Sequence, residues 1–308
     1  MREIFVENNR NSQTVISYIK QIFPSVKNSV LYKALRKKDI RKNDIKITKD
    51  CFVQNGDKLT IYIDDYLLYQ YPKKLNVIYQ DNHILAVCKP QGLLSNLENE
   101  VQSVKEKAKC GGREPTLESI VKEEYPKAQI LHRLDRNTAG IVLFALSKEG
   151  YQEMLDAFEN GYLKKEYLTY VANAHFEKKE ETLIQYITID RNNGYAIVHP
   201  KKKENSQKII TSYKVLKIDK EYDYAVLKVV IPTGKTHQIR AQMKAINHPI
   251  IGDSKYGKNE INHKFKKYKQ MLFAYRYTFS FPESSLLAYL NDLEIMLDGN
   301  DYMKKLGE

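Results

Sequence analysis

The chain has 308 residues, 42% of them hydrophobic, and this length and composition allow one large domain or two domains with real cores. The chain has 50 lysines and arginines and 38 aspartates and glutamates, a net charge of +12. This excess favours a polyanionic partner, with nucleic acid as the first candidate. The alternative is a basic protein that has no such partner. Three widely spaced cysteines without a C-x-x-C pair argue against a disulfide framework or a structural zinc site. With no signal peptide and no apolar stretch of about 20 residues, we expect a cytoplasmic protein without a membrane segment.

The first 72 residues predict a small unit of two helices and short strands. Apolar positions in residues 15–23 repeat with a helical period that Pro24 ends, and a second helix is expected from about residues 25–27. The segments that alternate apolar and polar residues predict short strands at 44–48, 50–53 and 56–63.

Positive charge is concentrated in this unit. Residues 27–49 contain nine Lys or Arg and two Asp, a net charge of +7, and phosphate contacts explain this excess better than a solvated helix face does. The stretch resembles an S4 RNA-binding domain, whose second half is matched by NDIKITKDCFVQNGDKLTIYI (43–63), although residues 46–48 are Lys-Ile-Thr where Val-Asn-Gly is usual. The resemblance implies that residues 1–72 bind RNA, through basic side chains that include Lys33, Arg36 and Lys37.

Residues 73–308 predict a second domain that is richer in strands. A polar loop is expected at 98–115, and helices at 116–125, capped by Thr116, and at 151–160, ended by Gly161. Since strands outnumber helices and do not alternate with them, the pattern favours an α+β fold with a mixed or antiparallel sheet. The predicted strands are 84–88, 164–172, 208–218, 224–232 and 272–282.

Charged residues come directly before the most apolar strand. Residues 141–146 are uninterrupted apolar residues, which predicts a strand buried on both faces, and HRLDR (132–136) precedes it. Asp135 is the single acid of this motif. Burial and neighbouring cations set the pKa of a carboxylate in such a place, as they do in many catalytic sites.

Several other kinds of catalytic site are excluded. GKT (234–236) lacks the earlier glycine of a P-loop, since residue 229 is valine, and HRLD lacks the glycine-rich loop and the asparagine of a kinase. A glycosidase needs two carboxylates, whereas a reaction in which the leaving base returns to the same sugar carbon needs neither water nor a second carboxylate.

Five motifs, in order, are similar to those of RluA-type pseudouridine synthases. They are KPQGLL (89–94), HRLDRNTAG (132–140), KEYLTYV (165–171), PTGKTHQIR (232–240) and GDSKYG (252–257). The resemblance covers residues 75 to about 290. It implies an enzyme that isomerises uridine to pseudouridine in RNA, on a mixed, mainly antiparallel sheet with flanking helices, without a metal or cofactor.

The resemblance also implies roles for single residues. Asp135 is expected to act on the target uridine, and Tyr167 to stack on the uracil with its hydroxyl near C5 as a candidate base. Lys235, where arginine is usual, is expected to pair with Asp135. Arg133 is expected to hold the RNA or fill the gap left by the flipped base. The residues expected to build the site or contact RNA are His132, Thr138, Gly140, Lys89 and Arg240, the last two as phosphate contacts.

The S4-like unit favours large-subunit ribosomal RNA of the 23S type as the substrate. We therefore expect a monomer with an RNA-binding domain at 1–72 and a catalytic domain at 73–308. Two alternatives stay open, namely the same reaction on tRNA and a non-catalytic RNA-binding or ribosome-assembly factor. The presence of both Asp135 and Tyr167 argues against the second alternative.

Overall fold

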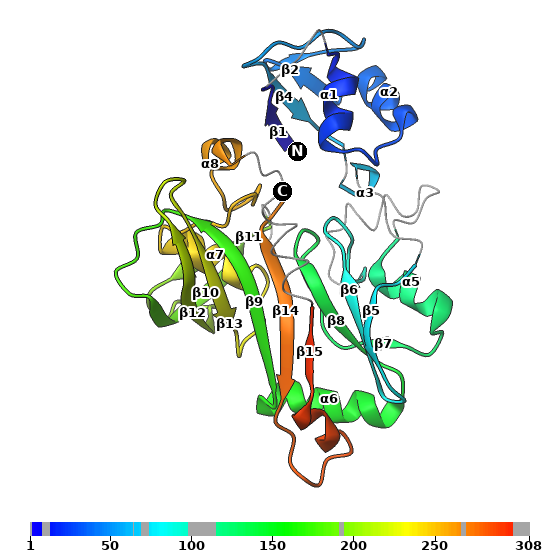
Figure 1. The fold of residues 1–308 in the computed structure, drawn as a ribbon, viewed down its shortest axis with the longest axis vertical. Helices are drawn as coiled ribbons and strands as arrows, with labels where there is room; N and C mark the ends of the chain where they lie inside the picture. The colour runs from blue at the N-terminus through cyan, green and yellow to red at the C-terminus, as the bar shows by residue number, and fades with distance from the viewer. Residues whose placement is uncertain are drawn as a thin grey trace. The chain divides into compact units, whose positions relative to one another are not determined.

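The structure, a computed structural model, describes residues 2–7, 13–63, 65–68, 74–97, 115–190, 194–265 and 269–297. The chain forms two compact units, one of Met1–Lys73 with Asn259–Tyr268 and the other of Lys74–Lys258 with Lys269–Glu308 (Figure 1). Most of the predicted loop at 98–115 lies outside the described residues.

The first unit is a small antiparallel sheet packed with helices, as expected for an S4-like unit. Its sheet has the order β1-β4-β2-β3, and its core includes Ile19, Leu31 and Leu35, which are at most 1% exposed. The prediction of a strand at 50–53 is wrong, because Phe52 forms only an isolated bridge with Thr14. The elements are β1 (Arg2–Phe5), α1 (Val15–Ile22), α2 (Asn28–Arg36), β2 (Ile40–Lys42), β3 (Ile45–Lys46), β4 (Lys58–Ile61), α3 (Asp65–Leu68) and α8 (Asn259–Lys264).

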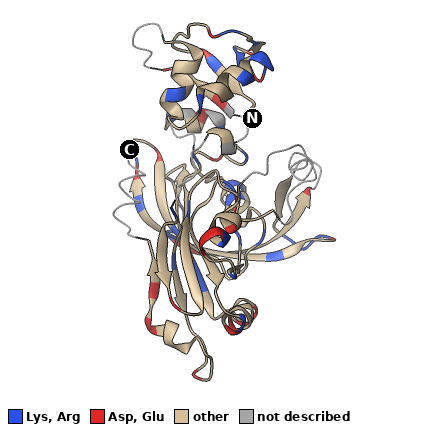
Figure 2. Ribbon diagram, turned by 90° about the vertical axis from the view of Figure 1, so that its right-hand side faces the viewer, with Lys and Arg blue, Asp and Glu red and all other residues tan. Residues whose placement is uncertain are grey.

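Basic side chains project from helix α2 into solvent. Lys33 and Arg36 lie in its last turn and Lys37 follows directly, and all three are exposed, while the apolar side of the helix is buried. Figure 2 shows lysines and arginines on the helices of this unit. This exposure makes the predicted RNA contacts sterically possible, and they stay a prediction.

The second unit is built on one large sheet with the order β11-β10-β12-β13-β9-β14-β8-β6-β5 (Figure 1). Only β14 and β8 pair in parallel among the described strands, so the sheet is mixed and mainly antiparallel, which confirms the prediction. Its strands are β5 (Val77–Gln80), β6 (Ile84–Lys89), β7 (Gln129–Ile130), β8 (Ala139–Ala145), β9 (Leu163–Ala172), β10 (Glu180–Asp190), β11 (Tyr195–His199), β12 (Gln207–Asp219), β13 (Tyr224–Val230), β14 (Leu272–Phe279) and β15 (Glu294–Met296).

The helices of this unit are α5 (Leu117–Glu124), α6 (Lys148–Asn160), α7 (Gln238–Ala245) and the 3₁₀ helix η1 (Ala288–Asp292). Thr116 caps α5 and Gly161 ends α6 in the left-handed conformation, as predicted. Helix α7 was not predicted. It buries Gln238, Arg240 and Gln242 along with its apolar residues, so its buried residues are not distinguished by polarity.

Strand β8 is buried along its whole length, which confirms the prediction of a two-sided core strand. Gly140 has φ +122°, and a Cβ atom there would lie 2.1 Å from Ala274 O on β14. Only glycine allows this close approach, because any side chain would clash with the neighbouring backbone. The charged segment 132–136 is thereby brought beside the centre of the sheet.

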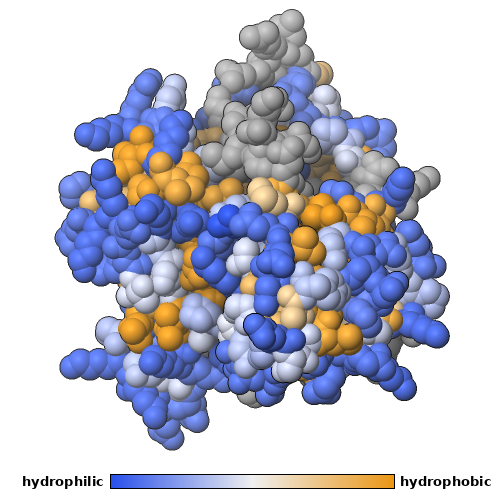
Figure 3. Space-filling model, turned by 60° about the horizontal axis from the view of Figure 1, so that its bottom comes forward, coloured by the Kyte–Doolittle hydropathy of each residue, from blue (hydrophilic) through white to orange (hydrophobic). Residues whose placement is uncertain are grey.

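None of the described helices is long and apolar enough to cross a membrane. Viewed with its lower end forward, the described surface is largely hydrophilic, and its hydrophobic residues form separate patches (Figure 3).

Candidate active site

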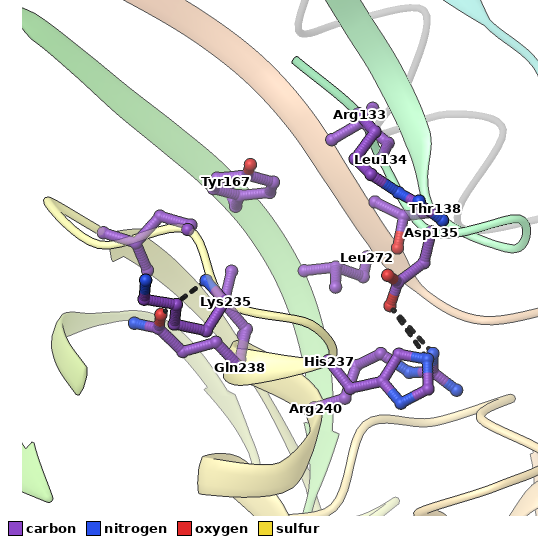
Figure 4. A pocket seen from close by; sticks show the side chains of 13 residues that line it. Arg133, Leu134, Asp135, Thr138, Tyr167, Lys235, His237, Gln238, Arg240 and Leu272 are labelled. Atoms are coloured by element: carbon purple, nitrogen blue, oxygen red, sulfur yellow. Dashed lines mark hydrogen bonds and ion pairs between the residues drawn. The ribbon is translucent and has the colours of Figure 1, made fainter. Parts of the chain in front are cut away.

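A pocket opens where the loop before β8, strand β9 and the loop before α7 meet (Figure 4). The space it encloses measures about 420 Å³, including the part open to solvent. Its walls are Arg133, Leu134, Asp135, Thr138, Tyr167, Ile231, Gly234, Lys235, His237, Gln238, Ile239, Arg240 and Leu272.

The turn after β6 fixes the loop that carries Asp135. Ser95 Oγ accepts a hydrogen bond from Leu134 N at 3.0 Å and donates one to Leu134 O at 2.9 Å. Gly92 N donates to Arg136 O at 2.9 Å. The backbone is therefore held on both sides of Asp135 by the segment that contains the KPQGLL motif.

Lys89 completes this framework from inside the core. Its side chain is fully buried, and Nζ donates to Pro90 O at 3.2 Å, Leu93 O at 2.8 Å and Arg136 O at 3.0 Å. Burial lowers the pKa of its ammonium to about 7, although the charge of Asp135 acts in the opposite direction. The prediction that Lys89 contacts a phosphate is wrong, because its donors are occupied by backbone carbonyls inside the protein.

Asp135 forms an ion pair with Arg240. Its Oδ2 accepts a hydrogen bond from Arg240 Nη1 at 2.8 Å, and His237 Nε2 lies 3.8 Å from the same oxygen. Oδ1 has no hydrogen-bond partner among the described residues, and the side chain is 23% exposed. Burial favours the neutral acid, but the charge of Arg240 and its hydrogen bond hold the pKa of Asp135 below its ordinary value. The pocket thus presents an ionised carboxylate with one open oxygen.

Arg240 is itself anchored by a second carboxylate. Its Nε donates to Asp253 Oδ2 at 2.7 Å and its Nη2 to Asp253 Oδ1 at 2.9 Å, while Asp253 is fully buried. Such a two-pronged pair fixes the plane of the guanidinium. The prediction that Arg240 contacts phosphate is wrong, because its side chain is 7% exposed and lies between two carboxylates.

Lys235 does not contact Asp135. Figure 4 shows Asp135, His237 and Arg240 on one side of the pocket and Tyr167 and Lys235 on the other. The predicted ion pair is wrong, because Arg240 takes the place expected for Lys235. Within the described parts of the chain, the Lys235 ammonium forms no ion pair, and its backbone N donates to Gln238 Oε1 at 3.1 Å.

His237 is a neutral hydrogen-bonding group at the start of α7. It has the left-handed φ of 56°, and its Nδ1 lies 2.9 Å from the Tyr256 hydroxyl, which accepts from Ala196 N at 2.7 Å. Since that hydroxyl oxygen accepts from Ala196, its own proton is available to Nδ1, and this arrangement directs Nε2–H toward Asp135. Burial lowers the pKa of His237 to about 4.

Tyr167 forms the opposite wall of the pocket. It projects from β9 and is 5% exposed, and the hydroxyl of Tyr277 on β14 donates to Ile141 O at 3.0 Å. Burial raises the pKa of Tyr167, and the charge of Asp135 adds to this. The phenol is therefore protonated at neutral pH.

His132 lies behind this wall and not in the pocket. Its Nε2 accepts a hydrogen bond from Leu143 N at 3.1 Å, and its ring packs edge-on against Tyr277 and Phe158 at centroid distances of 5.5 Å and 5.9 Å. Burial, together with the charge of Lys165, lowers its pKa to about 3. His132 is therefore a neutral support for Tyr277 and is not among the residues that line the pocket, and its contact with RNA stays a prediction.

The remaining predicted residues divide between the two units. Arg133 is exposed at the pocket, where its charge also lowers the pKa of Asp135, and Thr138 Oγ1 accepts from Gln270 Nε2 at 2.8 Å. Lys33, Arg36 and Lys37 belong to the first unit. Among the described residues, no group of three or more His, Cys, Asp and Glu side chains is arranged to bind a metal.

Three residues of the site were not identified from the sequence, namely Asp253, Tyr256 and Tyr277. The first two lie in GDSKYG, so the motif marked them without showing what they contact. No signal in the sequence marked Tyr277, which is one of 23 tyrosines.

The sequence model of the RNA pseudouridylate synthase family matches residues 83–245, more than half of the chain. An uncharacterized RNA pseudouridine synthase of Mycoplasma genitalium is 28% identical over 96% of this chain and 94% of its own length. A ribosomal large subunit pseudouridine synthase C of Rickettsia typhi is 27% identical over 79% of this chain and 82% of its own. A tRNA pseudouridine synthase C of Haemophilus influenzae is 33% identical over 59% and 76%. Among solved structures, human RNA pseudouridylate synthase domain containing 1 has a similar fold, with a TM-score of 0.53 and 20% identity over 77% of this chain and 98% of that one.

Proposed function

Since the chain belongs to the RNA pseudouridylate synthase family and is thus an isomerase that modifies RNA, we propose that it acts on large-subunit ribosomal RNA with Asp135 as its catalytic carboxylate. The catalytic role of Asp135 is supported by its ionised carboxylate, whose Oδ1 is open to a pocket with an aromatic ring as its other wall. The choice of large-subunit ribosomal RNA as the substrate depends on the basic N-terminal unit.

In the reaction, the bond between C1′ of the ribose and N1 of the uracil breaks, and a bond between C1′ and C5 forms. The proton that leaves C5 is balanced by the proton that N1 gains. The sugar carbon becomes electron-poor when the first bond breaks, and the carboxylate of Asp135 is the anion that would meet it. Arg240, held by Asp253, keeps this carboxylate ionised and fixed in orientation.

Tyr167 would hold the uracil ring after the uridine leaves its stack. Its aromatic face supports stacking, which any base accepts. Its raised pKa makes it a weak proton acceptor at neutral pH, so the proposal gives it the stacking role before that of a base. Arg133, exposed beside the pocket, would contact the RNA around the extruded nucleotide.

The choice of ribosomal RNA rests on two observations. The exposed cations of α2 give the first unit a basic surface that suits a large folded RNA. The large-subunit enzyme of R. typhi also aligns over more of this chain than the tRNA enzyme of H. influenzae does.

The test is to map pseudouridine in ribosomal RNA and tRNA from cells with and without the gene. We expect one or a few positions in large-subunit RNA to revert to uridine, and to be restored by the wild-type chain but not by Asp135→Asn. Loss of pseudouridine from tRNA alone would contradict the substrate, and restoration by Asp135→Asn would contradict the catalytic residue.

A further inference from the structure

The face of β9 that carries Tyr167 also carries a lysine outside the catalytic group. Residues i and i+2 of a strand project to the same side, so Lys165 and Tyr167 share a face. Lys165 Nζ lies 3.5 Å from the position that a Cβ atom on Gly234 would occupy, and Gly234 lines the pocket. The ammonium therefore reaches the wall of the pocket on the side of Tyr167.

No acid in the described parts of the chain neutralises this charge. No described carboxylate oxygen lies within 4.0 Å of Lys165 Nζ. The ammonium lies over the Phe158 ring, 5.3 Å from its centroid. A partly buried ammonium loses hydration, and a ring face restores less than an anion does. Accordingly, burial lowers the pKa of Lys165, with no opposing carboxylate.

The neighbouring lysine on the same strand shows the contrast. Lys164 points to the opposite face of β9, where its Nζ lies 3.2 Å from Glu166 Oε1. The strand thus pairs one lysine with an acid of the protein and leaves the next without one, beside the pocket. Such a cation is suited to an anion that arrives from outside.

We propose that Lys165 binds a backbone phosphate that flanks the target uridine. This inference rests on the proposed function, since a uridine extruded between Asp135 and Tyr167 would bring its own 5′ and 3′ phosphates to the wall of the pocket. The phosphate has the full negative charge that the neutral uracil ring lacks. Because Gly234 has no side chain, none stands between the ammonium and the loop that precedes α7 at this point.

The experiment uses the full-length chain and a short RNA that contains a uridine converted by the wild type. Two further RNAs carry a neutral methylphosphonate in place of the phosphate 5′ or 3′ of that uridine. Dissociation constants and single-turnover rates at saturating enzyme are measured for wild type, Lys165→Met, Lys165→Arg and the control Lys164→Met. Circular dichroism checks that each variant is folded.

We expect Lys165→Met to weaken binding of the natural RNA about tenfold or more, Lys165→Arg to restore most of it, and Lys164→Met to change it less than about threefold. One methylphosphonate should weaken wild-type binding by a similar factor and should not weaken Lys165→Met further. This loss of additivity identifies the phosphate.

Two outcomes would overturn the inference. In one, the effects of Lys165→Met and of each methylphosphonate multiply independently. In the other, Lys165→Met lowers the saturated rate and leaves the affinity unchanged, which would place the lysine at the uracil. In both, the wild type still converts its RNA, so the proposed function survives, whereas a wild type that converts neither ribosomal RNA nor tRNA would remove both proposals.

Discussion

Two carboxylates of the second unit lie among cations, and they differ in what their oxygens face. Glu166 is fully buried, with Oε1 at 3.2 Å and 3.7 Å from the ammonium groups of Lys164 and Lys228 and Oε2 bonded to Arg276. Asp135 has one oxygen fixed by Arg240 and the other open to the pocket.

The pKa of both carboxyls is held below the ordinary value, in each case because neighbouring cations outweigh burial. A lowered pKa therefore does not separate a structural carboxylate from a candidate catalytic one. The open oxygen of Asp135 does, since only an oxygen without a protein partner is available to a substrate.

The largest effect is expected when the charge of Asp135, the carboxylate with an open oxygen, is removed. Asp135→Asn keeps the shape of the side chain and removes its charge, so single-turnover pseudouridine formation should fall by about 10⁴-fold or more. Stability should change little, because Arg240 keeps its pair with Asp253. Rate and melting temperature are measured on the same preparation, and a rate within tenfold of the wild type would exclude Asp135 as the catalytic group.

Removal of the shared cation is expected to affect folding and pH dependence together. Arg240→Met leaves Asp253 buried without its partner, which should cost about 3–5 kcal/mol in the free energy of unfolding. The pKa of Asp135 should rise toward its ordinary value, so the acid limb of the pH–rate profile should move to higher pH. Urea unfolding checks the first effect and single-turnover rates against pH the second. The double variant Arg240→Met/Asp253→Asn should regain part of the stability, and no recovery would show that the loss has another cause.

The structural carboxylate should show the reverse profile. Glu166→Gln should lower the free energy of unfolding by about 1–3 kcal/mol and leave the rate per folded molecule within about threefold of the wild type. The folded pKa of Glu166 lies below its unfolded value of 4.5, so its contribution is complete above that value and is lost as the pH falls through the folded pKa. Unfolding free energies at pH 7 and pH 3 should therefore differ less in the variant, and an equal difference in both proteins would contradict this assignment.

The smallest effect is expected at Lys235. Its substitution tests whether the side of the pocket that bears Tyr167 and Lys235 acts separately from the side that bears Asp135. Lys235→Met should weaken RNA binding severalfold, reduce the slope of log affinity against log salt by about one, and leave the saturated rate unchanged. A shift of the acid limb of the pH–rate profile to higher pH in this variant would instead support an ion pair between Lys235 and Asp135, which the structure lacks.

The sequence predicted the type of sheet, the buried strand β8 and both caps, because these depend on local patterns of apolar residues, threonine and glycine. It did not predict the partner of Asp135. His237 and Arg240 lie three residues apart at the start of α7 and so reach the same side, whereas Lys235 precedes the helix.

The sequence pattern does not predict helix α7, because its polar residues are buried against other parts of the folded chain. The prediction that Lys89 contacts a phosphate was wrong for the same reason. The backbone carbonyls of Pro90, Leu93 and Arg136 surround its ammonium only in the folded chain.

The position of β14 has a consequence for when the protein becomes active. This strand, residues 272–279, lies between β8 and β9, and so joins the side of the pocket that bears Asp135 to the side that bears Tyr167. Both of those sides are synthesised before it. During translation the ribosome therefore releases two halves of a cleft that no strand yet connects, and the site can assemble only after β14 has left the exit tunnel. A growing chain would thus stay inactive toward the RNA around it until residues 272–279 have emerged.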